Sequence, residues 1–331
     1  MGKCMMAGTN VFSQEVVKNF EIVLPKTKVP NSLYNAIAFM DSRAGAKEIG
    51  IVDVGLLRNI EAKLVLKSPF QQQLQSVLAA LTDSTAKNGE LLLRLGRFNF
   101  AETYGTRYCY FDAGLYAKSG DSYSEIASID TVLVFRTASL NNLIKAESNI
   151  IVGFIATNLT RVPAGTSVYG LENIARIDSI EMRKIPVFNT ETYVDGVYTN
   201  FKSFANQVPD QKAFVDANRD GTIETVRVLD SNGKKIKIRP KEVYAVVHGG
   251  LPYIATQYGY YILRKSADNN FYFTGDIKTA ASQGDVNGGQ LAFGLLGAAL
   301  ASAGNRETYV LMVDYKNGSF IHIKKIPKPV E

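Results

Sequence analysis

One segment, residues 216–224, has the composition of a calcium-binding loop. Asp216, Asn218 and Asp220 supply oxygen atoms at the first, third and fifth positions of such a loop, and a glycine follows at the sixth. The twelfth position is Arg227, where a calcium loop has a bidentate carboxylate, and a cation there opposes the binding of Ca²⁺. Two interpretations stay open: a metal site, or a turn rich in Asp and Asn between two strands.

Tyrosines crowd a short region further along the chain, and four of them are Tyr253, Tyr258, Tyr260 and Tyr261. Tyrosine combines a large apolar ring with a polar hydroxyl, which suits it to line a ligand groove or platform. The same residues also pack in cores and hairpins. We take these four tyrosines as candidate ligand-binding residues, with core packing as the alternative.

Histidine and cysteine are scarce, since the chain has two of each. Cys4 and Cys109 cannot form a cysteine-rich zinc cluster, and two histidines leave imidazole chemistry short of ligands and bases. His248 precedes two glycines at the end of an expected strand, where a catalytic histidine or an anion-binding nest could lie. His322 alternates with apolar residues, so we expect it on the exposed face of a strand.

We therefore expect a protein that is not an enzyme, has no catalytic residue and needs no cofactor. The alternative is a hydrolase with an unrecognised Ser/His/Asp site near His248. No G-x-S-x-G elbow in the sequence supports that alternative.

The net charge of the chain does not indicate any particular class of binding partner. Its 37 basic and 31 acidic residues give a formal net charge of +6, which is mild for 331 residues. The densest basic run places Lys235, Lys237 and Arg239 on one face of a strand, opposite Ile236 and Ile238, as in a solvated strand. We expect no nucleic-acid partner, because the nearby aromatic residues are not interleaved with these charges.

The first half of the chain combines strand and helix patterns. Strands are indicated at 20–24, 36–40, 48–54, 90–101, 108–118 and 123–136. Residues 119–122 have the composition of a hairpin turn, and helical spacing runs from Pro69 to residue 88 and from 139 to 159. These patterns predict an antiparallel or mixed sheet with packed helices.

The second half changes to short strands separated by turns. Strands are indicated at 222–229, 235–238, 243–247, 258–264, 271–276, 308–314 and 319–324. Asn-Gly pairs at 232–233 and 317–318 mark two of the turns, and residues 171–183 have the pattern of a short helix. We expect an antiparallel β meander here, and so an α+β fold overall.

The opening residues, MGKCMMAGTNVFSQE, are lightly basic and then apolar with small side chains, like the end of a secretory signal peptide. We interpret residues 1–14 as a leader remnant and expect an exported protein; an ordinary frayed terminus is the alternative. We divide the remaining chain into an α/β sandwich domain at 15–160, a structured linker at 161–190 and a β-rich domain at 191–331.

The most apolar segment runs from Leu291 to Ala303 and is too short to cross a bilayer, at about 1.5 Å per helical residue. We expect either an insertion packed on its own domain or a peripheral contact with a membrane or partner.

Two parts of the sequence resemble known families. Residues 20–159, with the long strand that contains the residues YSEIASIDT at 123–131, look like the exported α/β domain of bacterial auxiliary lipoproteins. The later stretches DGVYT at 195–199, EVYAV at 242–246 and YVLMVD at 309–314 are similar to uncharacterised envelope proteins of Gram-negative bacteria.

The resemblance implies a periplasmic or outer-membrane-associated address and a non-enzymatic role. We therefore expect a binding or assembly module whose partner is a protein or another envelope component.

Overall fold

The computed structural model describes residues 16–43, 48–55, 60–103, 106–136, 139–276 and 308–326. Within these ranges the protein is β-rich, and one of its sheets is mixed, with helices packed on it. The expected combination of a mixed sheet with packed helices is thus confirmed at this coarse level. Both Cys4 and the segment from Leu291 to Ala303 lie outside the described residues.

The N-terminal half is built on a seven-stranded sheet. Its elements are β1 (Val16–Phe20), β2 (Tyr34–Asp41), β3 (Glu48–Val54), β4 (Ile60–Leu66), α1 (Phe70–Leu81), β5 (Gly89–Thr103), β6 (Thr106–Ser119), β7 (Ser122–Arg136) and α2 (Leu140–Asn158). The strand order is β1-β4-β3-β5-β6-β7, and β2 pairs with the first part of β5. Strands β5, β6 and β7 form an antiparallel meander, whereas β2 runs parallel to β5.

Both β2 and β3 lie on the same side of the long strand β5, one after the other. Where β3 meets β5, Gly50 has a φ of +144°, and a Cβ at this position would lie 2.1 Å from the carbonyl oxygen of Phe100. Only glycine allows this close approach of two backbones.

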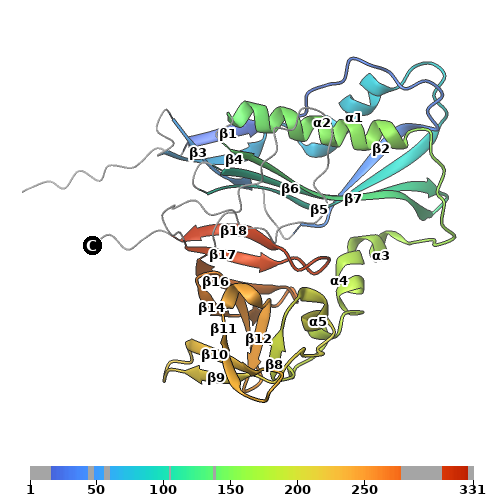
Figure 1. The fold of residues 1–331 in the computed structure, drawn as a ribbon. Helices are drawn as coiled ribbons and strands as arrows, with labels where there is room; N and C mark the ends of the chain where they lie inside the picture. The colour runs from blue at the N-terminus through green and yellow to red at the C-terminus, as the bar shows by residue number, and fades with distance from the viewer. Residues whose placement is uncertain are drawn as a thin grey trace, which may run out of the picture.

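Helices α1 and α2 cover one face of the sheet (Figure 1). Helix α1 buries Leu74, Val77, Leu78 and Leu81, which follow the helical period in the sequence. It ends at Leu81, seven residues before the expected stop, where the Thr82 hydroxyl donates a hydrogen bond to the carbonyl of Leu78. The start of α2 is as expected, because the Ser139 side chain accepts a hydrogen bond from the backbone N–H of Asn142.

The C-terminal half begins with short helices and continues into three small sheets. The helical elements are α3 (Leu171–Ala175), α4 (Ile177–Met182), η1 (Pro186–Phe188), α5 (Phe201–Ala205) and η2 (Pro240–Glu242). The strands are β8 (Gly196–Tyr198), β9 (Phe214–Ala217), β10 (Ile223–Leu229), β11 (Lys235–Ile238), β12 (Ala245–His248), β13 (Leu251–Thr256), β14 (Gly259–Ile262), β15 (Arg264–Lys265), β16 (Phe271–Asp276), β17 (Thr308–Val313) and β18 (Phe320–Ile326). Their sheet orders are β11-β10-β9, β14-β13-β12-β8 and β15-β16-β17-β18.

The sheet that contains β17 and β18 lies against the face of the N-terminal sheet that the helices leave uncovered (Figure 1). The N-terminal sheet is therefore covered on both faces, by helices on one and by the C-terminal half on the other. In the described part of the chain, no helix has the length and apolar character needed to cross a membrane.

Some elements differ from the sequence-based expectation. The first strand ends at Phe20, where a strand was expected to begin, and strands β4, β8, β9 and β13 were not expected. The single helix expected at 171–183 is two short helices, because Arg176 leaves the helical region with φ −108° and ψ 12°.

One acidic side chain is enclosed in the core between α2 and the sheet. Glu147 of α2 is fully buried, and its polar neighbour is the thiol of Cys109 on β6. Burial raises the pKa of Glu147 from 4.5 to about 8, so the carboxyl is protonated at neutral pH. The same burial raises the pKa of the Cys109 thiol, and Glu147 raises it further.

We predict that Glu147 makes the protein less stable as pH rises. Between pH 4.5 and about 8 the unfolded chain releases this proton while the folded chain keeps it, so the free energy of unfolding falls with rising pH. The loss amounts to at most about 5 kcal/mol. Urea denaturation of a Glu147→Leu variant should show a flatter pH dependence and a gain in stability at pH 8. An unchanged pH profile would contradict the prediction.

Candidate functional site

A row of charged side chains crosses the face of the N-terminal sheet that is turned toward the C-terminal half. Arg97 on β5 pairs in register with Asp112 on β6, which pairs with Asp130 on β7. Asp112 is buried, and the row sets two neighbouring aspartates against the single cation of Arg97, whose Nη1 lies 3.6 Å from Oδ1 of Asp130. A second positive charge from another part of the chain is needed to balance the two carboxylates.

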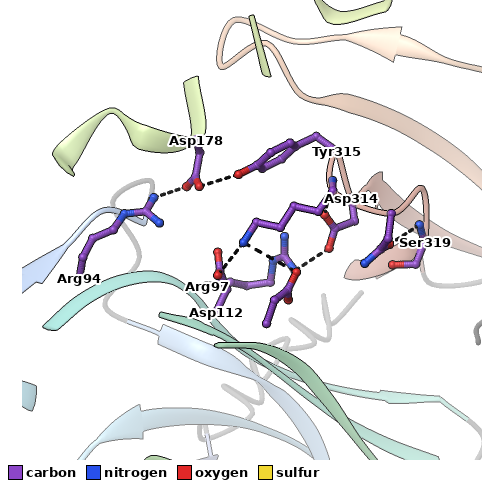
Figure 2. Close-up of polar contacts among 10 residues, drawn as sticks. Arg94, Arg97, Asp112, Asp178, Asp314, Tyr315 and Ser319 are labelled. Carbon is purple, nitrogen blue, oxygen red and sulfur yellow. Dashed lines mark hydrogen bonds and ion pairs between the residues drawn. The ribbon is translucent and has the colours of Figure 1, made fainter. Parts of the chain in front are cut away.

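The turn between β17 and β18 supplies that charge and inserts into the row (Figure 2). Lys316 places its Nζ 2.7 Å from Oδ1 of Asp112 and 3.7 Å from Oδ2 of Asp130. Arg97 donates a 2.9 Å hydrogen bond from Nη1 to Oδ2 of Asp314. We call these five residues, Arg97, Asp112, Asp130, Asp314 and Lys316, the polar seam.

The local sequence of the turn sets the positions of Asp314 and Lys316. The side chain of Asp314 accepts a hydrogen bond from the backbone N–H of Lys316, and Asn317 accepts one from the N–H of Ser319. Gly318 has a φ of +78°, and a Cβ there would lie 2.3 Å from the Phe201 ring. The Asn-Gly pair that predicted a turn thus also fixes the charged residues beside it.

The charges of the polar seam stabilise one another against burial. Burial alone would lower the pKa of the Arg97 guanidinium, but Asp314, Asp130 and Asp112 together raise it above its ordinary value. Lys316 behaves in the same way, because Asp112 and Asp130 outweigh its burial and raise its pKa. Burial and Asp314 raise the pKa of Asp130. The arrangement can hold two surfaces in one register, since a shift would leave buried charges without partners.

A second ion pair connects helix α4 to the same region. Arg94 on β5 donates to Asp178 on α4, and the hydroxyl of Tyr315 donates to the other oxygen of that carboxylate at 2.9 Å (Figure 2). Burial would raise the pKa of Asp178, but Arg94 and Tyr315 lower it below the ordinary value. Asp178 therefore connects α4 with the N-terminal sheet and with the β17–β18 turn.

The expectation that His322 is exposed was wrong. Its imidazole is buried against β6, with Nδ1 2.9 Å from the Tyr110 hydroxyl and the ring stacked on Tyr108. Burial lowers the pKa of His322 to about 4, so the ring is neutral at physiological pH. Alternation along β18 fails at this point, because the pairing with β17 shifts register and the consecutive residues Ile321 and His322 both contact β6 of the N-terminal sheet.

The four candidate tyrosines do not form one surface. Tyr253 and Tyr260 are buried on the side of the sheet that packs against β10, whereas Tyr261 packs on the other side. The Tyr253 hydroxyl donates to the carbonyl of Gly221 at 3.1 Å, and Tyr258 lies in the turn between β13 and β14. Their role in ligand binding stays a prediction.

The candidate calcium loop lies between β9 and β10. Oδ2 of Asp216 accepts a 2.5 Å hydrogen bond from Arg227, the residue at the twelfth position of the motif. Asp220 accepts a hydrogen bond from the backbone N–H of Thr222, as in an Asx turn, and Asn218 forms backbone hydrogen bonds across the loop. Within the described ranges no three His, Cys, Asp or Glu side chains are grouped as metal ligands. Calcium binding stays a prediction, and Arg227 competes for its first ligand.

His248 is exposed at the end of β12. The two glycines that follow it do form an anion-binding nest, and a carboxylate of the same chain fills it. Asp195 accepts hydrogen bonds from the N–H groups of Gly249 and Gly250, at 3.0 and 2.8 Å. The carboxylate of Asp195 thus contacts the backbone of the turn that follows His248.

A groove lies between β2 and α1, on the N-terminal half. Its volume is about 500 Å³, and it is lined by Asn35, Ala36, Ile37, Ala38, Gln71, Gln75, Leu78, Ala79 and Glu90. The side-chain amide of Gln71 donates a 2.8 Å hydrogen bond to the carbonyl of Ile37 in its wall. This groove was not expected from the sequence, because it depends on β2 lying at a sheet edge. A polar signal was present, in the run of glutamines at 71–73 on the first turns of an otherwise apolar helix.

Comparison with known proteins adds one distant likeness. No family model matches the chain, and no curated protein matches it. The crystal structure of a Xanthomonas campestris protein of the family DUF330 resembles part of it, at 12% sequence identity and a TM-score of 0.28. That match covers 50% of this chain and 99% of the other. A likeness of this size assigns no role to any residue, and the resemblance to envelope proteins stays a hypothesis.

We predict that loss of Arg97 weakens the whole protein. Arg97→Ala leaves Asp314 buried without its cation, which should lower the free energy of unfolding by about 3–5 kcal/mol. Arg227→Ala is the matched control, because it removes an ion pair that is well exposed and should cost at most about 1 kcal/mol. Urea denaturation followed by circular dichroism measures both. Equal effects of the two substitutions would contradict the importance of the polar seam.

We predict that His322 makes the protein sensitive to acid. From pH 6.5 down to about 4 the unfolded chain takes up a proton that the folded chain excludes, so stability falls as pH falls. The expected loss is about 3 kcal/mol. A His322→Gln variant keeps an acceptor for Tyr110 and should lose stability less steeply across this range in thermal melts. A slope equal to that of the unaltered protein would show that His322 does not titrate there.

Proposed function

We propose that this chain is a non-catalytic binding or assembly module of the cell envelope, and that it holds an extended peptide segment of a protein partner. The segment would lie in the groove between β2 and α1. The observation that carries the proposal is the edge strand β2, whose Ile37 carbonyl is bound by a glutamine side chain inside that groove.

The edge of β2 has the chemistry that an added strand uses. Among the described residues β2 pairs with β5 alone, so its other side presents backbone groups to the groove. The amide of Gln71 gives the Ile37 carbonyl the hydrogen bond that a further strand would give. A partner segment in extended conformation can take over this contact and continue along the edge.

The walls of the groove suit a polypeptide backbone. Ala36, Ala38 and Ala79 are small, which lets another main chain approach closely. Gln75 lies beside Gln71, and primary amides both donate and accept, as peptide groups do.

The envelope address in the proposal rests on the leader-like opening residues and on the resemblance stated from the sequence. The contacts of the polar seam and of His322 support a non-catalytic role, because these charged and aromatic groups join two parts of the same chain.

We predict that the groove selects peptides. A display library of random peptides panned against the whole protein should yield binders, and their affinities can be measured by calorimetry. Ala79→Trp fills the groove from an exposed position and should weaken these peptides by at least about tenfold. Ser76→Trp is the matched control, because Ser76 is equally exposed on α1 and does not line the groove.

Hydrogen exchange gives the second readout, since a bound strand should slow exchange of the backbone amides of β2. No enrichment of peptides would contradict the proposal. So would peptides that bind the Ala79→Trp variant as tightly as the unaltered protein.

A further inference from the structure

The small sheet β11-β10-β9 has one buried and one exposed face. Val226 and Val228 of β10 are buried against the neighbouring sheet, and the residues between them point to the other side. The register places Phe214, Arg227 and Lys237 in one row across the exposed face. We call this surface the basic face.

Cations dominate the basic face. Leu229 and Lys235 form the next row, and Lys212 reaches the same face from the residues before β9. Asp216 contributes a carboxylate, but Arg227 is paired with it. Lys212, Lys235 and Lys237 remain as three ammonium groups on a surface of three short strands.

The aromatic ring on this face is already covered. The Nζ atom of Lys235 lies 4.1 Å from the centroid of the Phe214 ring, and that of Lys212 lies 5.6 Å from it. A single-stranded nucleic acid would need a free ring on which its bases could stack. The covered ring therefore disfavours a nucleic acid as the occupant of the basic face.

An apolar side chain is exposed among the lysines. Leu229 pairs in register with Lys235 and is 45% exposed. Lysine is a flexible point charge that reaches past such a residue, whereas a precise phosphate site would use the planar fork of arginine. A surface with ammonium groups around an exposed aliphatic residue matches the boundary between phosphate headgroups and acyl chains.

We propose that the basic face docks the protein on a membrane surface rich in anionic phospholipids. Lys212, Lys235 and Lys237 attract the headgroup phosphates, and Leu229 enters the boundary layer. The attraction is additive, and each lysine contributes roughly fivefold to membrane affinity. This surface is distinct from the groove between β2 and α1. A negative result for membrane docking would therefore leave the peptide-binding proposal unaffected, and the reverse also holds.

Vesicle sedimentation tests the proposal with the whole protein. Vesicles of phosphatidylcholine mixed with phosphatidylglycerol should bind it, vesicles of phosphatidylcholine alone should not, and added salt should weaken binding. The double variant Lys235→Glu and Lys237→Glu should bind the anionic vesicles at least about twentyfold more weakly. Lys26→Glu with Lys145→Glu is the matched control, because both lysines are exposed on the N-terminal half and the net charge changes equally.

A neutral double variant, Lys235→Gln and Lys237→Gln, controls for misfolding. Its affinity for the anionic vesicles should fall, but less than that of the Glu variant. Its melting temperature should be unchanged. Equal losses in the Lys26/Lys145 control would overturn the proposal, because net charge alone would then explain binding. Binding of polyuridylate or polyglutamate in preference to the anionic vesicles would also overturn it.

Discussion

The rest of the structure depends on the requirement that buried charges have partners. Arg97, Asp112 and Asp130 form a row on a sheet face that is covered by the C-terminal half, and isolated charges there would be costly. The β17–β18 turn brings Asp314 and Lys316 into that row. The polar seam therefore sets how the two halves meet, while Tyr108 and His322 extend the contact with apolar and aromatic surface.

The covering of the N-terminal sheet determines which surfaces remain for binding. Helices occupy one face and the β17–β18 sheet occupies the other, so the edge at β2 is the part of this sheet that faces the groove (Figure 1). In the C-terminal half, β10 buries its valines and leaves the basic face outward. The two proposed surfaces thus follow from the same packing constraint, at a strand edge and at a sheet face.

Much of this architecture could be predicted from local patterns. Strand-forming composition identified β5, β6 and β7, helical spacing identified α2, and an Asn-Gly pair identified the turn before β18. The polar seam could not be predicted, because Lys316 lies about 200 residues from Asp112 and no local pattern encodes that contact. The burial of His322 could not be predicted either, because a register shift in the β17–β18 pairing interrupts the period of two and the covering sheet is distant in sequence.

The central claim is that the polar seam makes the two halves one cooperative unit. Native-state hydrogen exchange measured strand by strand tests it most directly, because it reports the free energy at which each segment opens. The account predicts that β6, β7, β17 and β18 exchange with a common opening free energy that rises and falls together with pH. Separate opening of β17 and β18, at a much lower free energy than that of β6 and β7, would contradict it.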